Sequence, residues 1–113
     1  MDRILLASDP KAKEALFTLC RELGYPNPQF AVSAGEAKRK ISEGEFDLLM
    51  INTPLPDEFG RDLAITAQEK SLAGVIMLVG NGQADRIAAG VEKYGVLVLS
   101  KPLSRSLLAQ SLK

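Results

Sequence analysis

The feature that most constrains this chain is a regular alternation between short apolar runs and longer amphipathic stretches. Five runs have the length and apolar character of buried strands, at residues Ile4–Ala7, 30–33, 48–51, 75–79 and 96–99. Stretches with helical spacing of apolar residues separate or follow them, at residues 10–23, 35–42, 61–70, 83–94 and 104–112. Near-continuous apolar strands are typical of a parallel sheet that helices cover on both faces.

The connections between these elements are short, so we expect one α/β domain over residues 1–113. Right-handed crossovers and five strands favour a doubly wound sheet in the order 2-1-3-4-5, with helices on both faces, as in flavodoxin-like folds. In that order the carboxyl ends of strands 1, 3, 4 and 5 meet at one crevice. Open α/β proteins usually display their functional groups there.

Asn52 stands at the mouth of this crevice, directly after the apolar run at residues 48–51. A carboxylate in this place could bind a metal ion or take up a phosphoryl group, whereas a neutral amide does neither well. The neighbouring strand ends present Ser8 and Asp9, then Val79 and Gly80, then Ser100 and Lys101. The crevice therefore has the location of a reactive site but a neutral side chain at its centre.

Charge balance and cysteine content exclude other classes of protein. The chain has 14 Lys and Arg residues against 14 Asp and Glu residues, so nothing indicates broad electrostatic binding to nucleic acid or membrane. The single cysteine, Cys20, cannot form an internal disulfide, which fits a reducing compartment. We expect neither a membrane span nor a signal peptide, and therefore a cytoplasmic protein.

Three sequence blocks share an order and spacing with a known family. They are Ile4-Leu5-Leu6-Ala7-Ser8-Asp9, then Asp47-Leu48-Leu49-Met50-Ile51-Asn52-Thr53-Pro54-Leu55-Pro56 with Gly60 after it, and finally Lys101-Pro102. Over essentially its whole length, the chain resembles the receiver domain of bacterial two-component response regulators. This resemblance implies a CheY-like fold and a place in a phosphorelay.

The resemblance also implies a role for each residue at the crevice. A typical receiver has an aspartate nucleophile on strand 3, an acidic pair after strand 1 that holds Mg²⁺, a hydroxyl residue ending strand 4, an aromatic residue on strand 5 and a phosphate-contacting lysine. The matching positions here are Asn52 for the nucleophile, Ala7 and Ser8 or else Ser8 and Asp9 for the acidic pair, Val79 for the hydroxyl, Val98 for the aromatic residue and Lys101 for the lysine.

Of these positions, only Lys101, with Pro102 behind it, keeps the family pattern. Phosphoryl transfer needs an anionic nucleophile and a cation, and the departures remove both. We therefore expect a degenerate pseudo-receiver that is not phosphorylated, is not an enzyme and holds no metal or other cofactor. Lys101 is expected to bridge toward Asn52 or Asp9. The family also makes Lys101-Pro102 a candidate cis peptide bond.

Residues 52–60 and 95–106 narrow the resemblance to receivers attached to ANTAR domains, which are helical modules that bind RNA hairpins and prevent transcription termination. No such module lies within the 113 residues, so the chain is either a fragment cut before its effector or a stand-alone domain. The resemblance implies a homodimer that makes no nucleic-acid contact of its own. The expected dimer face spans helix 4, strand 5 and helix 5 and includes Ile87, Val91, Leu107, Leu108 and Leu112.

Other interpretations of the same residues stay open. A conventional receiver could use another acceptor, such as Asp57, and a flavodoxin-like domain could bind a small ligand. The second alternative has little support, because the chain has no histidine, no phosphate-loop motif and no nucleophile–base pair. Single residues also have structural roles available: Asn52 could cap the turn after it, and Asp9 could cap helix 1. Asp57 and Glu58 could be solvated or could cap the next helix.

Overall fold

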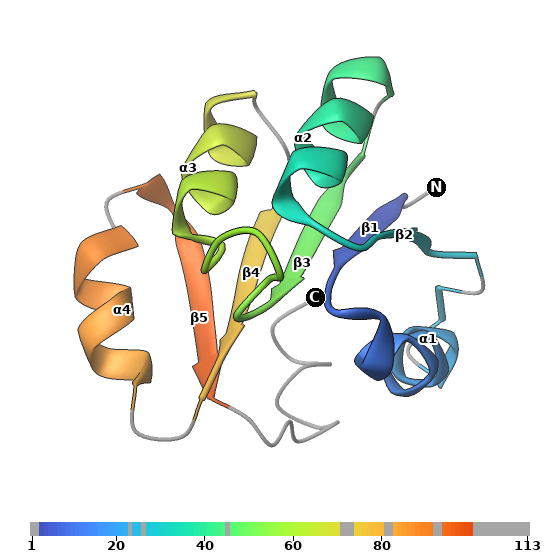
Figure 1. The fold of residues 1–113 in the computed structure, drawn as a ribbon, viewed down its shortest axis with the longest axis horizontal. Helices are drawn as coiled ribbons and strands as arrows, with labels where there is room; N and C mark the ends of the chain where they lie inside the picture. The colour runs from blue at the N-terminus through green and yellow to red at the C-terminus, as the bar shows by residue number, and fades with distance from the viewer. Residues whose placement is uncertain are drawn as a thin grey trace.

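The computed structural model describes residues 3–22, 24–25, 27–44, 46–70, 74–80, 83–91 and 94–100. Within these residues, five parallel strands form one sheet in the order β2-β1-β3-β4-β5 (Figure 1). The strands are β1 at Ile4–Ala7, β2 at Gln29–Ala31, β3 at Leu48–Asn52, β4 at Gly74–Val79 and β5 at Val96–Ser100. The fold class and strand order that the sequence predicts are therefore confirmed.

Helices follow the strands as the alternation predicts. The described part of the chain contains α1 at Lys13–Glu22, α2 at Ala34–Glu43, α3 at Arg61–Glu69 and α4 at Ala84–Val91. A 3-10 turn at Pro10–Ala12 precedes α1, and Asp9 caps this turn by accepting a hydrogen bond from the Lys11 backbone N–H at 2.9 Å. The helix expected at residues 104–112 lies outside the described residues. None of the described helices is long and apolar enough to cross a membrane.

The second strand ends earlier than its apolar run predicts. β2 covers Gln29–Ala31, whereas the sequence favoured residues 30–33. Ser33 is the N-cap of α2, and its hydroxyl oxygen accepts a hydrogen bond from the Glu36 backbone N–H at 3.1 Å. A serine in this position satisfies a backbone donor that would otherwise have no partner in the helix. Ser33 is therefore the start of the helix and not the end of the strand.

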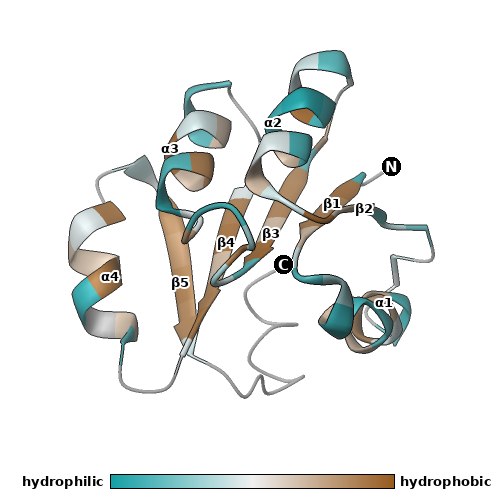
Figure 2. Cartoon of the chain, in the orientation of Figure 1, coloured by the Kyte–Doolittle hydropathy of each residue, from teal (hydrophilic) through white to brown (hydrophobic). Residues whose placement is uncertain are grey.

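Each face of the sheet has its own apolar core, because successive strand side chains point to opposite faces. On one face, Leu5, Leu49 and Met77 pack with side chains of α2, α3 and α4. On the other face, Leu6 and Met50 pack with side chains of α1. Figure 2 shows the strands as a hydrophobic layer, whereas the helices carry both hydrophobic and hydrophilic residues. This two-sided core holds the carboxyl ends of β1, β3 and β4 in fixed register.

Cys20 belongs to the core on the α1 face. It is fully buried, and this burial raises the pKa of its thiol to about 11. The thiol is therefore protonated at neutral pH and packs as a small apolar side chain, without the reactivity of a thiolate.

Candidate functional site

The crevice at the carboxyl ends of the strands contains a direct contact between Asn52 and Ser8. Ala7 pairs with Ile51 in the sheet, so the next residue of each chain segment comes close to the other. Asn52 Nδ2 donates a hydrogen bond to Ser8 Oγ at 3.1 Å, and the Ser8 hydroxyl donates one to the Asp9 backbone oxygen at 2.9 Å. Ser8 is fully buried and Asn52 is half-buried. A buried neutral hydroxyl thus meets the amide at the centre of the site.

Ala7 and Asp9, the residues on either side of Ser8, use their side chains for other contacts. Ala7 is fully buried and packs in the core that faces α2 and α3. Asp9 is half-buried, and its carboxylate accepts the hydrogen bond that caps the turn before α1. Of the three residues considered for the acidic pair, Ser8 places its side chain against Asn52.

The crevice residues do not fit a magnesium site. Mg²⁺ prefers carboxylate oxygens in near-octahedral geometry. Ser8 and Asn52 are neutral and hydrogen-bonded to each other, and the Asp9 carboxylate caps a helical turn. In the described ranges, no three His, Cys, Asp or Glu side chains gather closely enough to hold a metal ion. The described crevice therefore offers one carboxylate, that of Asp9, where divalent-cation chemistry requires several anionic donors.

The ends of β4 and β5 contribute apolar side chains. Val79 is fully buried in the core and pairs in register with Ser100. Val98 is partly buried and packs against the same core. Neither valine side chain can donate a hydrogen bond to a bound anion. Lys101 and Pro102, the other expected site residues, lie outside the described residues.

Thr53, which sequence reasoning did not single out, ties the end of β3 to β4. It is 2% exposed, and its backbone N–H and its Oγ1 hydroxyl both donate to the Leu78 carbonyl, at 3.0 and 2.7 Å. The peptide bond that follows, Thr53-Pro54, is cis. The family resemblance makes the bond before Pro102 a candidate cis bond, and this bond lies outside the described residues. Because any X-Pro bond can be cis, the sequence gives no specific signal for the bond at Pro54.

Two acidic side chains of the loop after β3 cap the neighbouring helices. The Asp57 carboxylate oxygens accept hydrogen bonds from the first turn of α2, from the Ala34 N–H at 2.9 Å and the Gly35 N–H at 3.0 Å. Glu58 accepts one from the Leu63 N–H of α3 at 3.1 Å. Of the roles open from the sequence, Glu58 takes that of a cap for the next helix, whereas Asp57 caps the preceding one.

The same loop is linked to α2 a second time by an ion pair. Lys38 Nζ of α2 lies 3.4 Å from Glu58 Oε2, and both side chains are partly exposed, so the pair contributes at most about 1 kcal/mol. Asp57, the alternative phosphoryl acceptor, uses each of its two carboxylate oxygens to accept a backbone hydrogen bond, which makes both oxygens weaker nucleophiles. Its position therefore favours a structural role.

The Asp57→Asn variant is expected to be less stable than the wild type at neutral pH, with the difference disappearing in acid. Hydrogen bonds from the Ala34 and Gly35 N–H groups hold the pKa of Asp57 below its usual 3.8. A lowered folded-state pKa stabilises the fold above the unfolded pKa, and this contribution is lost as the pH falls through the folded value. The free energies of unfolding of the two proteins, measured with urea, should therefore differ above about pH 5 and become equal near about pH 2.

The matched control for this experiment is Asp62→Asn, which removes an exposed aspartate from the first turn of α3. This variant removes the same charge but keeps the two hydrogen bonds that Asp57 accepts from α2. A stability difference for Asp57→Asn that stays constant over the whole pH range would contradict the capping role.

Of the residues expected to form a dimer face, Ile87 and Val91 lie in the described part of the chain. Ile87 is half-buried and lines a groove beside α4. Val91 is fully buried in the core, so its assignment to an exposed face is wrong. The physical reason is that an amphipathic helix turns its apolar stripe toward the sheet. Leu107, Leu108 and Leu112 lie outside the described residues.

This chain matches known proteins when three-dimensional structures are compared. No protein-family model and no curated protein matches the sequence. A CheY-like response regulator receiver domain protein from Methanospirillum hungatei is 23% identical, with a TM-score of 0.84 over 99% of this chain and 90% of that one. A protein named as a response regulator from Chloroflexus aurantiacus is 26% identical, with a TM-score of 0.82 over 100% of this chain and 96% of that one.

A third match holds a metal ion. The receiver domain of a sensor histidine kinase from Pseudomonas aeruginosa, solved with a magnesium ion coordinated in its active-site cleft, is 21% identical to this chain. The match covers 99% of this chain and 95% of that one, with a TM-score of 0.78. The fold of this chain is therefore the CheY-like receiver fold, and the solved structures that it matches include response regulators and receiver domains.

Proposed function

We propose that this chain is a regulatory, receiver-like domain of a two-component response regulator that is not phosphorylated. Its support is the receiver fold, matched over nearly the whole chain, together with the neutral residues at the strand ends. The observation that carries the proposal is the 3.1 Å hydrogen bond from Asn52 to Ser8. It joins two uncharged groups at the place where a phosphorylated receiver needs a nucleophile and a metal-binding carboxylate.

Neither partner of this hydrogen bond is suited to accept a phosphoryl group. The Asn52 amide is a neutral, poor nucleophile. Ser8 could serve only if a base took its proton, and its hydroxyl instead donates to the Asp9 backbone oxygen at 2.9 Å. Because a backbone carbonyl is not a general base, Ser8 is not activated. We infer that the domain has no catalytic role.

A domain that is not phosphorylated would regulate through the surfaces with which it contacts other proteins. We propose that the domain acts as a homodimer, or through contacts with a partner protein, to control an effector in the cytoplasm. The resemblance to ANTAR-linked receivers favours an RNA-binding transcription antiterminator as this effector, present after residue 113 in the same polypeptide or as a separate protein. The receiver-like domain itself would make no contact with the RNA, in keeping with its net charge of +0.

Incubation with Mg²⁺ and acetyl phosphate is expected to add no phosphoryl group to the protein, because the crevice offers neither an anionic nucleophile nor a cation site. Intact-protein mass spectrometry checks the mass. Sedimentation and thermal unfolding in the presence of Mg²⁺ and beryllofluoride, which mimics a bound phosphoryl group, should show the same oligomeric state and melting temperature as in buffer.

A conventional receiver domain in the same reaction serves as the positive control. A gain of one phosphoryl group by the wild-type chain would contradict the proposal. Two single variants would then show which residue carries the phosphoryl group. Its loss in Asp57→Asn would identify a non-standard acceptor on the loop after β3, whereas its loss in Ser8→Ala would identify the buried hydroxyl.

A further inference from the structure

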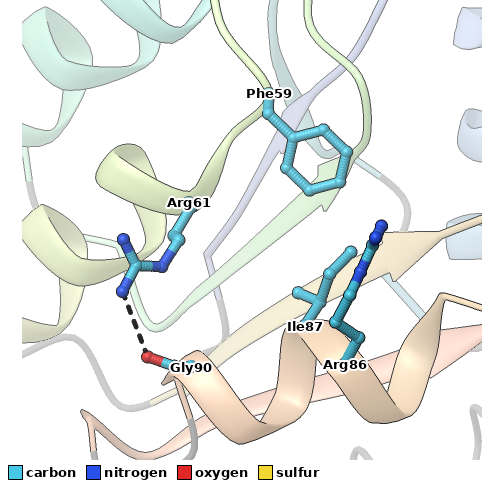
Figure 3. Close-up of a pocket in the computed structure, with 5 residues that line it drawn as sticks. All are labelled: Phe59, Arg61, Arg86, Ile87 and Gly90. Atoms are coloured by element: carbon cyan, nitrogen blue, oxygen red, sulfur yellow. Dashed lines mark hydrogen bonds between the residues drawn. The ribbon is translucent and has the colours of Figure 1, made fainter.

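A second concave site lies between the loop after β3 and α4. Phe59, Arg61, Arg86, Ile87 and Gly90 line this groove, and its volume is about 290 Å³. Figure 3 shows the Ile87 and Arg86 side chains extending from α4 toward the Phe59 ring, while Arg61 reaches toward Gly90. Phe59 is 38% exposed, although an aromatic ring of this size is normally covered. The groove therefore presents an apolar surface that a partner could cover.

Two guanidinium groups flank this apolar surface. Arg61 is held in place because its Nη2 donates to the Gly90 carbonyl at 3.4 Å, near the carboxyl end of α4. Arg86 is exposed on the side of α4 that borders the groove. Among the residues that the structure describes, no carboxylate forms an ion pair with either arginine. Positive charge thus borders the apolar surface of the groove.

We propose that this groove binds an acidic segment of a partner protein. An apolar side chain of the segment would cover Phe59 and Ile87, and carboxylates on either side of it would bind Arg61 and Arg86. Guanidinium groups form paired hydrogen bonds with carboxylates, and aromatic and arginine side chains supply much of the binding energy at protein interfaces. A volume of about 290 Å³ lies at the lower end of ligand pockets, so it fits one or two side chains better than a cofactor.

The charge distribution favours a protein segment over a nucleic acid. Nucleic-acid binding draws on several phosphate contacts and a basic surface, whereas this chain has a net charge of +0 and two arginines at the groove. Phe59, Ile87 and the two arginines take no part in the Asn52–Ser8 contact, so binding in the groove and phosphorylation of the crevice are measured separately.

A nuclear magnetic resonance titration of the ¹⁵N-labelled chain tests this proposal. The probe is the blocked peptide Gly-Asp-Leu-Phe-Glu-Gly, added up to millimolar concentration, where weak interfaces are still detected. We expect the largest shifts at the backbone amides of Phe59, Arg61, Ile87 and Gly90. A peptide with Asn and Gln in place of Asp and Glu should bind roughly tenfold more weakly, because it loses the charge-assisted hydrogen bonds.

Variants at exposed positions keep the test independent of folding. Phe59→Ala and Arg86→Ala should each weaken binding about three- to tenfold, and the double variant should weaken it further. Arg39→Ala removes an exposed helical arginine from α2 and should leave the affinity unchanged. The proposal is overturned if the peptide causes no shifts at the groove, if the double variant binds normally, or if the uncharged peptide or a single-stranded oligonucleotide binds there equally well.

Discussion

The Ser8→Asp/Asn52→Asp double variant is expected to lose about 2–4 kcal/mol of stability at neutral pH without divalent cations, and to regain most of it with Mg²⁺. Ser8 is fully buried and its hydroxyl oxygen lies 3.1 Å from the Asn52 amide nitrogen. Two carboxylates in these places would be desolvated and would repel each other. The wild type, which holds two neutral groups there, should unfold at the same temperature with Mg²⁺ or with a chelator.

The pH dependence of the double variant provides a second measurement. Desolvation and the like charge should raise the folded-state pKa values of the two new carboxyl groups above their unfolded value of about 4. A raised folded pKa destabilises the fold progressively as the pH rises above the unfolded pKa. The difference from the wild type should therefore be small near about pH 4 and largest above about pH 7. Because Mg²⁺ binds the folded site, it should reduce the difference most where both groups are ionised.

The single variant Asn52→Asp is the matched control for this experiment. It introduces one carboxylate, and the Ser8 hydroxyl can turn from the Asp9 backbone oxygen to donate to it. Its loss of stability should therefore be much smaller and nearly independent of Mg²⁺. The neutral side chains of Ser8 and Asn52 are argued to prevent metal binding. This explanation is wrong if Mg²⁺ stabilises the wild type or fails to stabilise the double variant.

The strand order could be predicted because it follows from general rules. Apolar runs at Ile4–Ala7 and residues 48–51 indicate buried parallel strands, and right-handed crossovers leave few arrangements of five such strands. The boundary of the second strand was less predictable. Ser33 follows an apolar run, and only its hydrogen bond with the Glu36 N–H shows that it begins α2. A single side-chain cap thus decided a boundary that hydrophobic patterning left open.

The candidate site was predictable in its residue types but not in its contacts. The neutral character of Asn52 and Ser8 is visible in the sequence, whereas their hydrogen bond joins residues 44 positions apart and depends on the register of β1 and β3. Asp57 reaches back 23 positions to Ala34, so no local pattern identifies its partner. Val91, by contrast, lies on the apolar stripe of α4, and its burial could have been expected from helical periodicity.

Gly60→Ala is expected to destabilise the protein by about 2–4 kcal/mol, measured by urea unfolding. Gly60 has a φ of 122°, in a region that residues with a Cβ rarely adopt. A Cβ added there would lie 2.9 Å from Ile51 Cγ2 and 3.3 Å from Thr53 Cγ2, and both neighbours are buried at the end of β3. The substitution therefore combines backbone strain with a steric clash directly beside Asn52.

Gly24→Ala separates these two contributions. Gly24 has a φ of 96°, but a Cβ added there would meet nothing within 4 Å, so the variant has backbone strain without a clash. It should lose only about 1–2 kcal/mol. The clash at Gly60 should also displace Ile51, and with it the neighbouring Asn52, so ¹⁵N shifts at Ser8 and Asn52 should change in Gly60→Ala and not in Gly24→Ala. Equal losses of stability in the two variants would mean that the end of β3 moves to accommodate the added methyl group. The strand register that places Asn52 against Ser8 would then not be rigid.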